Sequence, residues 1–193
     1  MPSEHSLKAD YFEGMFRNDP DPWALSSSPY EAAKHAATVE ALGGRRYRRG
    51  LEVGCAGGAL TRRLAPGCDH LTALDISETA AARARDRTAD LTQVEVRRMT
   101  FPAETPSGLF DLVVLSEVAY YWSDADLERA AAWLRTAVEP DGDLLLVHWT
   151  GKTDYPQSGD AAVAKLWTAL SADFLRLREE TTTAYRLDLW RRR

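Results

Sequence analysis

The sequence predicts an α/β protein in which a mostly parallel sheet is covered by helices on both faces and ends in an antiparallel hairpin. After Gly50, short apolar runs alternate with segments whose apolar residues have helical spacing, which is the pattern of a doubly wound sheet. A glycine-rich turn at Gly54 follows the first apolar run, and a lone aspartate, Asp75, ends the second. Together these features outline a nucleotide-binding βαβ unit of the Rossmann-like kind.

Five apolar runs have strand character, and three segments between them have helical character. The expected strands are Leu51–Val53, His70–Leu74, Val94–Arg97, Leu112–Leu115 and Asp143–Trp149. The expected helices are Ala59–Leu64, Glu78–Ala89 and Asp124–Val138. We expect a Ser or Asp at the start of the third helix to cap it. The turn residues of Glu139–Asp143 should end that helix and start the next strand.

The C-terminal segment changes character, because its apolar residues alternate with polar ones. Leu175 and Leu177, and then Tyr185, Leu187 and Leu189, recur with period two. That period is typical of a half-exposed antiparallel pair rather than another βαβ unit. The hairpin would complete a seven-stranded sheet, and it counts against a plain dinucleotide-binding dehydrogenase.

Residues 1–49 precede the sheet and are expected to form a helical lid segment. We expect a short amphipathic helix within His5–Phe16 and a second helix over Ser27–Leu42, capped by serine and opened by Pro29. The prolines of Arg17–Pro29 should make that stretch irregular, because each lacks an N–H and favours extended geometry in the preceding residue. Residues 50–193 would then be the core of a single domain over residues 1–193.

The bulk composition is that of an ordinary soluble globular domain. The chain has 193 residues, 45% hydrophobic and 27% charged, with a net charge of −5 that disfavours nucleic acid as a partner. No apolar stretch approaches the roughly 18 residues of a membrane span, and the N-terminus lacks the apolar core of a signal peptide. Cys55 and Cys68 are too few for a disulfide framework or a zinc site, so we expect no metal. A cytoplasmic protein is the expectation.

The glycine turn departs from the dinucleotide fingerprint G-x-G-x-x-G. Residues 54–58 read GCAGG, so Ala56 adds a methyl group where the backbone and a pyrophosphate would have to touch. Glu52, just before the turn, suits an ammonium group better than a phosphate. Asp75 follows Gly54 by about 20 residues, where a carboxylate can accept both ribose hydroxyls. The turn therefore predicts a nucleoside that carries a positive or zwitterionic tail and no phosphates.

Four ordered motifs carry a resemblance to a known family. LEVGCAGG and ALDIS resemble the first two motifs of class I S-adenosylmethionine-dependent methyltransferases. FDLVVLSEVAYYW and VEPDGDLLLVHW resemble the later motifs, at the fourth and fifth strands. With these, DPDPWALSSSPYEAAKHAATVEAL is similar to the nodulation-type (NodS-like) N-methyltransferase family, which methylates the amino group of a deacetylated chitooligosaccharide. The resemblance implies a small methyltransferase and does not carry over the acceptor.

The resemblance implies S-adenosylmethionine as the cofactor. The glycine turn would line its methionine moiety, Asp75 would hold the ribose, and Ile76 would lie against the adenine. Many relatives carry an acidic residue after the third strand, where this chain has Met99 and Thr100, so apolar packing and backbone contacts should hold the adenine. The expected cofactor-binding residues are Trp23, Tyr30, Glu52, Gly54, Cys55, Ala56, Gly57, Asp75, Ile76, Met99, Thr100, Leu115 and Ser116.

Trp23 and Tyr30 enter that set as candidates for a lid over the cofactor. Lys34 lies on the same helix face as Tyr30, so both could address one carboxylate. The structural alternatives are an anchoring role for Trp23 and a solvated position for Lys34. His35, on the same helix, is a further candidate for a base.

Methyl transfer is an in-line displacement by a neutral nucleophile, so the acceptor needs alignment and a proton acceptor. His148 ends the fifth strand and is expected to face the crevice, with a satisfied strand-end histidine as the alternative. Glu117 could take the proton or attract a cationic amine, or it could cap a helix. Tyr120, Tyr121 and Trp122 form an aromatic cluster that favours cations, although at most two of them can face one pocket. The expected catalytic residues are His148, Glu117 and Tyr120.

The acceptor is expected to be a small molecule, because the chain leaves no room for a separate substrate domain. Lys152, Asp154 and Tyr155 lie in a polar loop that should form the substrate rim, unless it is an ordinary surface loop. An amine, in particular an amino group on a sugar, is the first choice, and a hydroxyl group is the alternative. A non-catalytic adenosylmethionine-binding relative is the rival hypothesis, and the chain is expected to be a monomer or homodimer.

Overall fold

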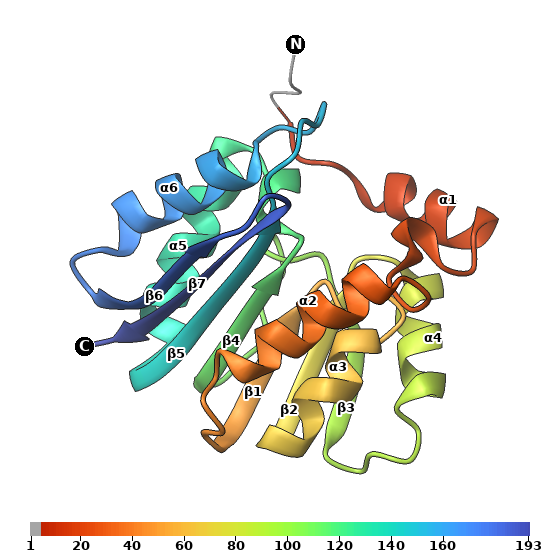
Figure 1. Cartoon of the computed structure of the whole chain (residues 1–193), viewed down its shortest axis with the longest axis horizontal. Helices are drawn as coiled ribbons and strands as arrows, with labels where there is room; N and C mark the ends of the chain where they lie inside the picture. Colours follow the sequence, from red (N-terminus) through yellow and green to blue (C-terminus); the bar gives the residue numbers. More distant parts are fainter. Residues whose placement is uncertain (1–4) are drawn as a thin grey trace. The chain divides into compact units, whose positions relative to one another are not determined.

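The computed structural model describes residues 5–193, which form two compact units (Figure 1). One unit runs from Lys8 to Thr100, and the other combines residues 5–7 with Phe101–Arg193. The single-domain organisation expected for residues 1–193 therefore stays a prediction. Within residues 5–193, no helix combines the length and apolar character that a bilayer crossing requires.

The first unit contains three parallel strands, β1 (Tyr47–Val53), β2 (Cys68–Asp75) and β3 (Val94–Arg98). Each begins at or before the expected residue, because polar residues at the strand starts still pair through their backbones. Leu51 and Leu74 are fully buried, as expected for strands with both faces covered. All three strands end at the edge where the glycine turn and Asp75 lie.

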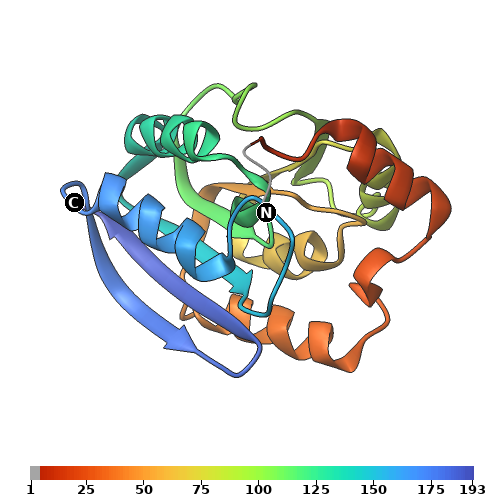
Figure 2. The ribbon, with the colours of Figure 1, turned by 90° about the horizontal axis from the view of Figure 1, so that it is seen from above.

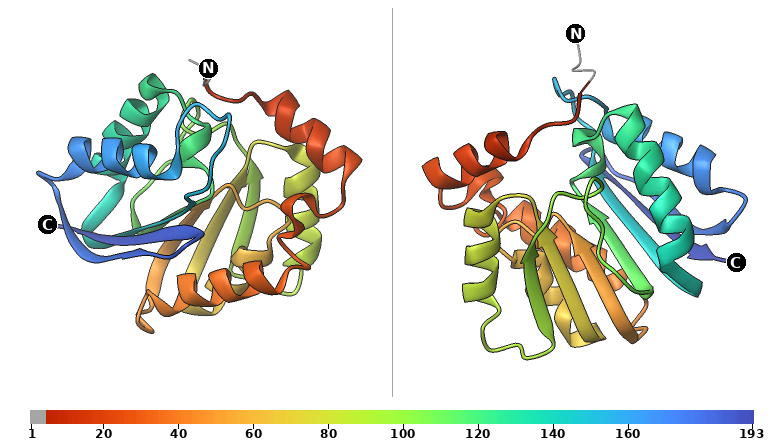
Figure 3. Two further views of the ribbon diagram at one scale, coloured as in Figure 1. Left: turned by 45° about the horizontal axis from the view of Figure 1, so that its top comes forward. Right: turned by 180° about the vertical axis from the view of Figure 1, so that it is seen from behind.

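The helices of this unit are α1 (Ala9–Asn18), α2 (Pro29–Glu40), α3 (Ala59–Leu64) and α4 (Glu78–Arg87), with short 3₁₀ turns at Pro22–Ala24 and Ala65–Gly67. Pro29 opens α2 as predicted, but the Ser28 side chain makes no capping hydrogen bond, so the predicted serine cap is wrong. Ser77 does cap α4, because its hydroxyl accepts the Ala80 N–H at 3.1 Å. Helix α1 lies beside α4 (Figure 3).

The second unit contains the parallel pair β4 (Phe110–Ser116) and β5 (Val138–Trp149), followed by the hairpin β6 (Phe174–Thr181) and β7 (Tyr185–Arg192). The predicted hairpin is confirmed: β7 pairs antiparallel with both β5 and β6. The sheet order is β3-β2-β1-β4-β5-β7-β6. The predicted mostly parallel, seven-stranded α/β fold is confirmed for the described part of the chain.

One prediction for the second unit, the position of the Glu139–Asp143 turn, needs correction. The Glu139–Asp143 turn does not separate helix from strand: Val138 pairs with Phe110 and Asp143 with Leu112, so the turn is an irregularity inside β5. At this irregularity the Asp141 backbone adopts a left-handed conformation with a φ of 61°.

Helix α6 (Gly159–Leu170) was not predicted. Its buried face has helical spacing, and the Ser158 hydroxyl caps it by accepting the Ala161 N–H at 3.1 Å. It packs beside α5 (Asp124–Ala137), whose predicted start at Asp124 is confirmed and whose cap is Ser123 (Figure 2).

Candidate functional site

The glycine turn is fixed to the end of β2 by its backbone. The N–H groups of Gly54 and Cys55 both donate to the Leu74 carbonyl, each at 2.8 Å. Gly54 has a φ of 80°, which glycine adopts without strain. Ala56 has a φ of 48°, a left-handed conformation that costs a non-glycine residue about 1–2 kcal/mol. The alanine that replaces the second fingerprint glycine thus occupies a position that favours glycine.

The next two glycines have different roles. A Cβ built on Gly57 would meet no atom within 4 Å, so this residue leaves open space at the turn. A Cβ on Gly58 would lie 3.0 Å from the Ala84 Cα atom, and Gly58 also has a φ of 78°. Gly58 therefore lets α3 and α4 pack closely. Gly57 is the position where an added side chain would project into the candidate site.

Asp75 is buried at the end of β2 and faces the glycine turn. Its Oδ2 accepts the Ala56 N–H and its Oδ1 accepts the Ser77 N–H, both at 2.8 Å. Burial raises the pKa of Asp75 to about 6, against the lowering effect of these backbone donors. Each carboxylate oxygen has a further lone pair, so the group can accept additional donors.

Glu52 is the second buried carboxyl group beneath the turn, and only 1% of the residue is exposed. Its Oε2 atom has no hydrogen-bond partner among the residues that the structure describes. Burial raises the pKa of Glu52 to about 7, with the hydroxyl of Thr61 opposing and the charge of Asp75 adding to the rise. A desolvated carboxyl group of this kind gains most from a cationic partner.

The remaining residues expected around the nucleoside lie at the same edge of this unit. Met99 follows β3, and its N–H donates to the Asp75 carbonyl at 2.8 Å. Met99, Thr100 and Ile76 are each partly exposed. Cys55 is buried, and burial raises the pKa of its thiol well above the ordinary range, so it is an apolar wall rather than a reactive group.

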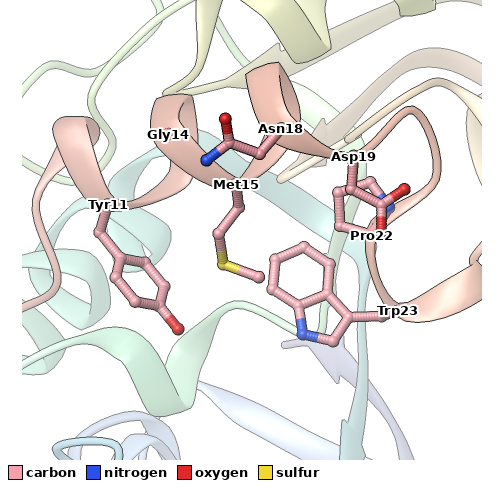
Figure 4. A pocket seen from close by; sticks show the side chains of 7 residues that line it. All are labelled: Tyr11, Gly14, Met15, Asn18, Asp19, Pro22 and Trp23. Atoms are coloured by element: carbon pink, nitrogen blue, oxygen red, sulfur yellow. The ribbon is translucent and has the colours of Figure 1, made fainter.

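Trp23 lies on a pocket of about 450 Å³ beside α1 (Figure 4). The side chains of Tyr11, Met15 and Trp23 point into it, and the full lining is Tyr11, Gly14, Met15, Asn18, Asp19, Pro22 and Trp23. Trp23 and Ala24 have φ values of 59° and 53°, which cost about 1–3 kcal/mol each. The Asp21 carboxylate holds this turn by accepting the N–H groups of Ser26 and Ser27 at 2.9 and 3.0 Å.

Helix α2 presents its candidates differently from the expectation. Lys34 is buried and its Nζ pairs with Glu31 at 2.9 Å, so the solvated position is wrong, whereas a role with Tyr30 toward a ligand carboxylate stays a prediction. The Lys34 Nζ also lies 5.3 Å from the centroid of the Tyr30 ring, which is 41% exposed. His35 is buried, with its Nε2 atom 3.9 Å from Glu31. The Lys34 ammonium therefore has a carboxylate partner on its own helix.

In the second unit, Glu117 follows β4 directly after Leu115 and Ser116, which are both buried. The Glu117 N–H donates to the Val147 carbonyl at 2.8 Å, and its φ of 58° is strained for glutamate. Its Oε2 accepts the Tyr120 hydroxyl at 2.6 Å and the Trp149 N–H at 2.9 Å. The end of β4 is thus built to hold one carboxylate in place.

An aromatic cluster of Tyr120, Tyr121 and Tyr155 contacts that carboxylate through the Tyr120 hydroxyl. The Tyr120 and Tyr155 rings are stacked at 5.5 Å, and the Tyr121 ring lies 4.7 Å from Tyr155. Burial and the charge of Glu117 raise the pKa of Tyr120 well above its ordinary value, so it donates to Glu117 at neutral pH. Trp122 instead packs on Phe101 in the core, with a ring-centroid distance of 5.5 Å. This agrees with the expectation that at most two of Tyr120, Tyr121 and Trp122 face the same pocket.

We expected His148 to face an open crevice, but the residue is fully buried. Its Nε2 accepts the Ala119 N–H at 3.1 Å, and its ring lies 5.6 Å from the Tyr120 ring. A nitrogen that accepts this N–H can take a proton only by losing that hydrogen bond. The placement corresponds to the alternative of a buried strand-end histidine whose Nε2 has a backbone partner.

The loop after β5 contributes one of its three expected contacts to this cluster. Tyr155 stacks on Tyr120, whereas Lys152 and Asp154 are exposed. The Gln157 N–H donates to the Tyr120 carbonyl at 3.1 Å, which ties the loop to the cluster. Over residues 5–193, no group of three or more His, Cys, Asp or Glu side chains could hold a metal ion.

The sequence did not reveal one residue beside the candidate site, Glu13, or the packing role of one turn glycine, Gly58. Glu13 of α1 bonds to Ser77 and Thr79, next to Asp75, across 64 residues of chain. Gly58 was grouped with the turn, although its contact with Ala84 makes it a packing residue. The role of Glu13 depends on a long-range contact that no local pattern encodes. The packing role of Gly58 could have been predicted, because a third glycine at a helix start indicates close packing of that helix.

Solved structures of other proteins share this fold. The N-methyltransferase NodS from Bradyrhizobium japonicum WM9, in complex with S-adenosyl-L-homocysteine, matches with a TM-score of 0.81 at 23% identity, over 96% of this chain and 99% of that one. A putative methyltransferase from Pseudomonas syringae matches with a TM-score of 0.75 at 40% identity, over 84% of this chain and 99% of that one.

Sequence relatives point to the same group of proteins. Nodulation protein S of Rhizobium tropici is 38% identical over 130 residues, which are 65% of this chain and 53% of that protein. This chain spans between about half and three fifths of the length of such curated relatives. The family model described as nodulation protein S (NodS) matches residues 13–176. Because that match covers most of the described residues, the chain belongs to the nodulation protein S family.

Proposed function

We propose that this protein is an S-adenosylmethionine-dependent methyltransferase that acts on a small-molecule amine. The observation that carries the proposal is the pair of buried carboxyl groups, Glu52 and Asp75, beneath a turn that Gly57 leaves open. Two carboxylates repel a pyrophosphate and suit a nucleoside with a cationic tail. The NodS structure with S-adenosyl-L-homocysteine adds support from the same family.

The residues present fit the adenosyl cofactor. The buried Oε2 of Glu52, without a partner among the described residues, suits the cofactor's ammonium group. Asp75 has lone pairs available for ribose hydroxyls after accepting Ala56 and Ser77. Ile76, Met99 and Thr100 would border the base, and Leu115 and Ser116 the methionine portion. Trp23 and Tyr30 are proposed as lid residues. When bound, S-adenosylmethionine supplies an electrophilic methyl group on a sulfonium centre.

We assign to Glu117 the role of general base, which removes a proton from the amine that is to be methylated. An amine attacks only as the free base, so an ammonium form must first lose a proton. The carboxylate is already oriented by Tyr120 and the Trp149 N–H, and Tyr120 stays protonated as its donor. The rings of Tyr121 and Tyr155 offer faces that attract a cationic amine before it is deprotonated. Tyr120 is therefore an orienting group in this proposal.

His148 takes a positioning role in the proposal rather than that of a base. Its hydrogen bond to the Ala119 N–H fixes the start of the turn that carries Tyr120 and Tyr121. The 5.6 Å ring contact with Tyr120 supports the same role. Alignment of the acceptor is the main contribution that such residues make to a displacement reaction.

We also propose a cytoplasmic location and action as a single domain on a small acceptor, with no nucleic acid as partner. The net charge of −5 opposes nucleic-acid binding. The two cysteines are free and buried, which agrees with a reducing compartment. Whether the chain acts as a monomer or homodimer belongs to the same proposal and is decided by light scattering.

The proposal is tested by incubating the protein with S-adenosylmethionine and a panel of paired acceptors, each amine or aminosugar matched by its hydroxyl analogue. Mass spectrometry of the products should show the gain of one CH₂ in the amines and loss of that product with Glu117→Gln. Methylation of the hydroxyl analogues alone would make the protein an O-methyltransferase. Cofactor binding with no product from any acceptor would favour the non-catalytic alternative.

A further inference from the structure

Glu13, on helix α1, reaches across to the start of α4. Its Oε2 accepts the Ser77 hydroxyl at 2.7 Å and the Thr79 N–H at 3.1 Å, and its Oε1 accepts the Thr79 hydroxyl at 2.7 Å. These donors lower the pKa of Glu13 to about 2, so the group is ionised at any physiological pH. A carboxylate from one helix therefore occupies the donor-rich N-terminus of another.

Ser77 connects this contact to Asp75. Ser77 is fully buried, its N–H donates to Asp75 Oδ1 at 2.8 Å, and its hydroxyl accepts the Ala80 N–H at 3.1 Å. Because the hydroxyl hydrogen goes to Glu13, every polar atom of the Ser77 side chain has a fixed partner. A continuous chain of hydrogen bonds therefore runs from Glu13 through Ser77 to Asp75, and from there to the Ala56 N–H.

A second contact holds the C-terminal end of α1. The Arg83 guanidinium of α4 donates to the carbonyls of Phe16, Asp19 and Pro20 at 2.6, 2.9 and 3.1 Å. These carbonyls belong to the end of α1 and the residues just after it, where a helix leaves acceptors unsatisfied. Only Phe12 and Phe16 of α1 are buried, so its apolar packing is small. Polar contacts at the middle and at the C-terminal end of α1 thus hold this helix against α4.

We infer that Glu13 is a positioning residue for the cofactor site: it fixes the Ser77–Asp75 turn and holds α1, with its pocket side chains, against α4. This inference rests on the proposed function for the identity of the cofactor. Loss of the carboxylate leaves the Ser77 hydroxyl hydrogen without its acceptor and removes the contact that holds the middle of α1 against α4. The ribose carboxylate then loses its fixed orientation, and the lid that carries Tyr11 and Met15 loses its anchor.

The test compares Glu13→Ala with the conservative Glu13→Gln. The Gln carbonyl can accept from Ser77 and from the Thr79 N–H, while its amide can donate to the Thr79 hydroxyl, so the contacts with Ser77 and Thr79 survive and only the exposed pair with Arg17 is lost. Calorimetry with S-adenosylhomocysteine should show a dissociation constant raised roughly tenfold in Glu13→Ala and within about twofold of the parent in Glu13→Gln. Arg17→Ala is the matched control, because Arg17 pairs with Glu13 on the exposed side.

Amide hydrogen exchange of the ligand-free protein gives a second readout, which separates this inference from the proposed function. Protection across α1 should fall in Glu13→Ala and in Arg83→Ala and stay unchanged in Arg17→Ala. Failure of the parent protein to bind S-adenosylhomocysteine would refute the proposed function. The exchange data would still decide whether Glu13 and Arg83 hold α1 against α4. An unchanged dissociation constant in Glu13→Ala, or no rescue by Glu13→Gln, would overturn the positioning role.

Discussion

Replacing Glu52 with glutamine should stabilise the ligand-free protein and weaken cofactor binding at the same time. Glu52 is a buried carboxyl group whose Oε2 lacks a partner among the described residues, so its ionised form is destabilising without a cation. Glutamine has the same shape and carries no charge. The two effects of Glu52→Gln therefore have opposite signs, which a merely structural glutamate would not produce.

The magnitude follows from the pKa of Glu52, which burial raises from an ordinary 4.5 to about 7. A raised carboxyl pKa means that the folded state binds the proton more tightly than the unfolded state. The stability from this group is thus present below about pH 4.5 and lost as the pH rises through 7. At about 1.4 kcal/mol for each pKa unit, the loss above pH 7 is on the order of 3 kcal/mol.

The assay is urea unfolding of both proteins, followed by tryptophan fluorescence at several values from pH 4.5 to 8. The free energy of unfolding of Glu52→Gln should exceed that of the parent by up to about 3 kcal/mol at pH 8, with little difference at pH 4.5. Affinity for S-adenosylhomocysteine should fall roughly ten- to a hundredfold, because the ammonium loses its counter-charge. A stability difference that does not change with pH would refute this account of Glu52.

Four other substitutions separate folding from function. Gly57→Ala should reduce S-adenosylhomocysteine affinity at least tenfold in calorimetry while the free energy of unfolding stays within about 1 kcal/mol, since its Cβ meets no atom within 4 Å; a drop in stability alone would speak against an open cradle. Gly58→Ala should lower that free energy by about 2–4 kcal/mol in urea unfolding, because of its φ of 78° and the 3.0 Å approach to Ala84, and an unchanged midpoint would contradict this. Ala56→Gly should change stability by less than about 1 kcal/mol, in the stabilising direction, as relief of the left-handed strain exceeds the added chain entropy; clear destabilisation in the same assay would be inconsistent with strain. Glu117→Gln should slow methyl transfer roughly a hundredfold with cofactor affinity unchanged, and full activity at neutral pH would remove its base role.

Most of the fold could be predicted because its signals are local. The apolar runs of β1, β2 and β4 and the period-two alternation of β6 and β7 identify strand and sheet type directly. Strand starts were placed too late, because polar residues near the start of a strand, such as Arg49, pair through their backbones without an apolar pattern that shows it. The Glu139–Asp143 turn was misplaced because a turn sequence does not say whether the strand continues around it.

In the candidate site, too, the locally encoded features could be predicted and the long-range contacts could not. Gly54, Glu52 and Asp75 could be identified from one motif, because the turn and the strand end that it contacts are coded within a single βαβ unit. The contact between Glu13 and Ser77 and the stacking of Tyr155 on Tyr120 arise only when distant segments meet. His148 was expected at an open crevice, but strand position does not reveal which backbone group covers a side chain.

The most direct test of the account is a pair of calorimetric titrations of the intact protein, one with S-adenosylhomocysteine and one with NAD. The two buried carboxyl groups and the left-handed Ala56 predict a single site for S-adenosylhomocysteine and no heat of binding with NAD. Gly57→Ala serves as the matched control and should lose the first signal. Binding of NAD without binding of S-adenosylhomocysteine would contradict the assignment of the glycine turn.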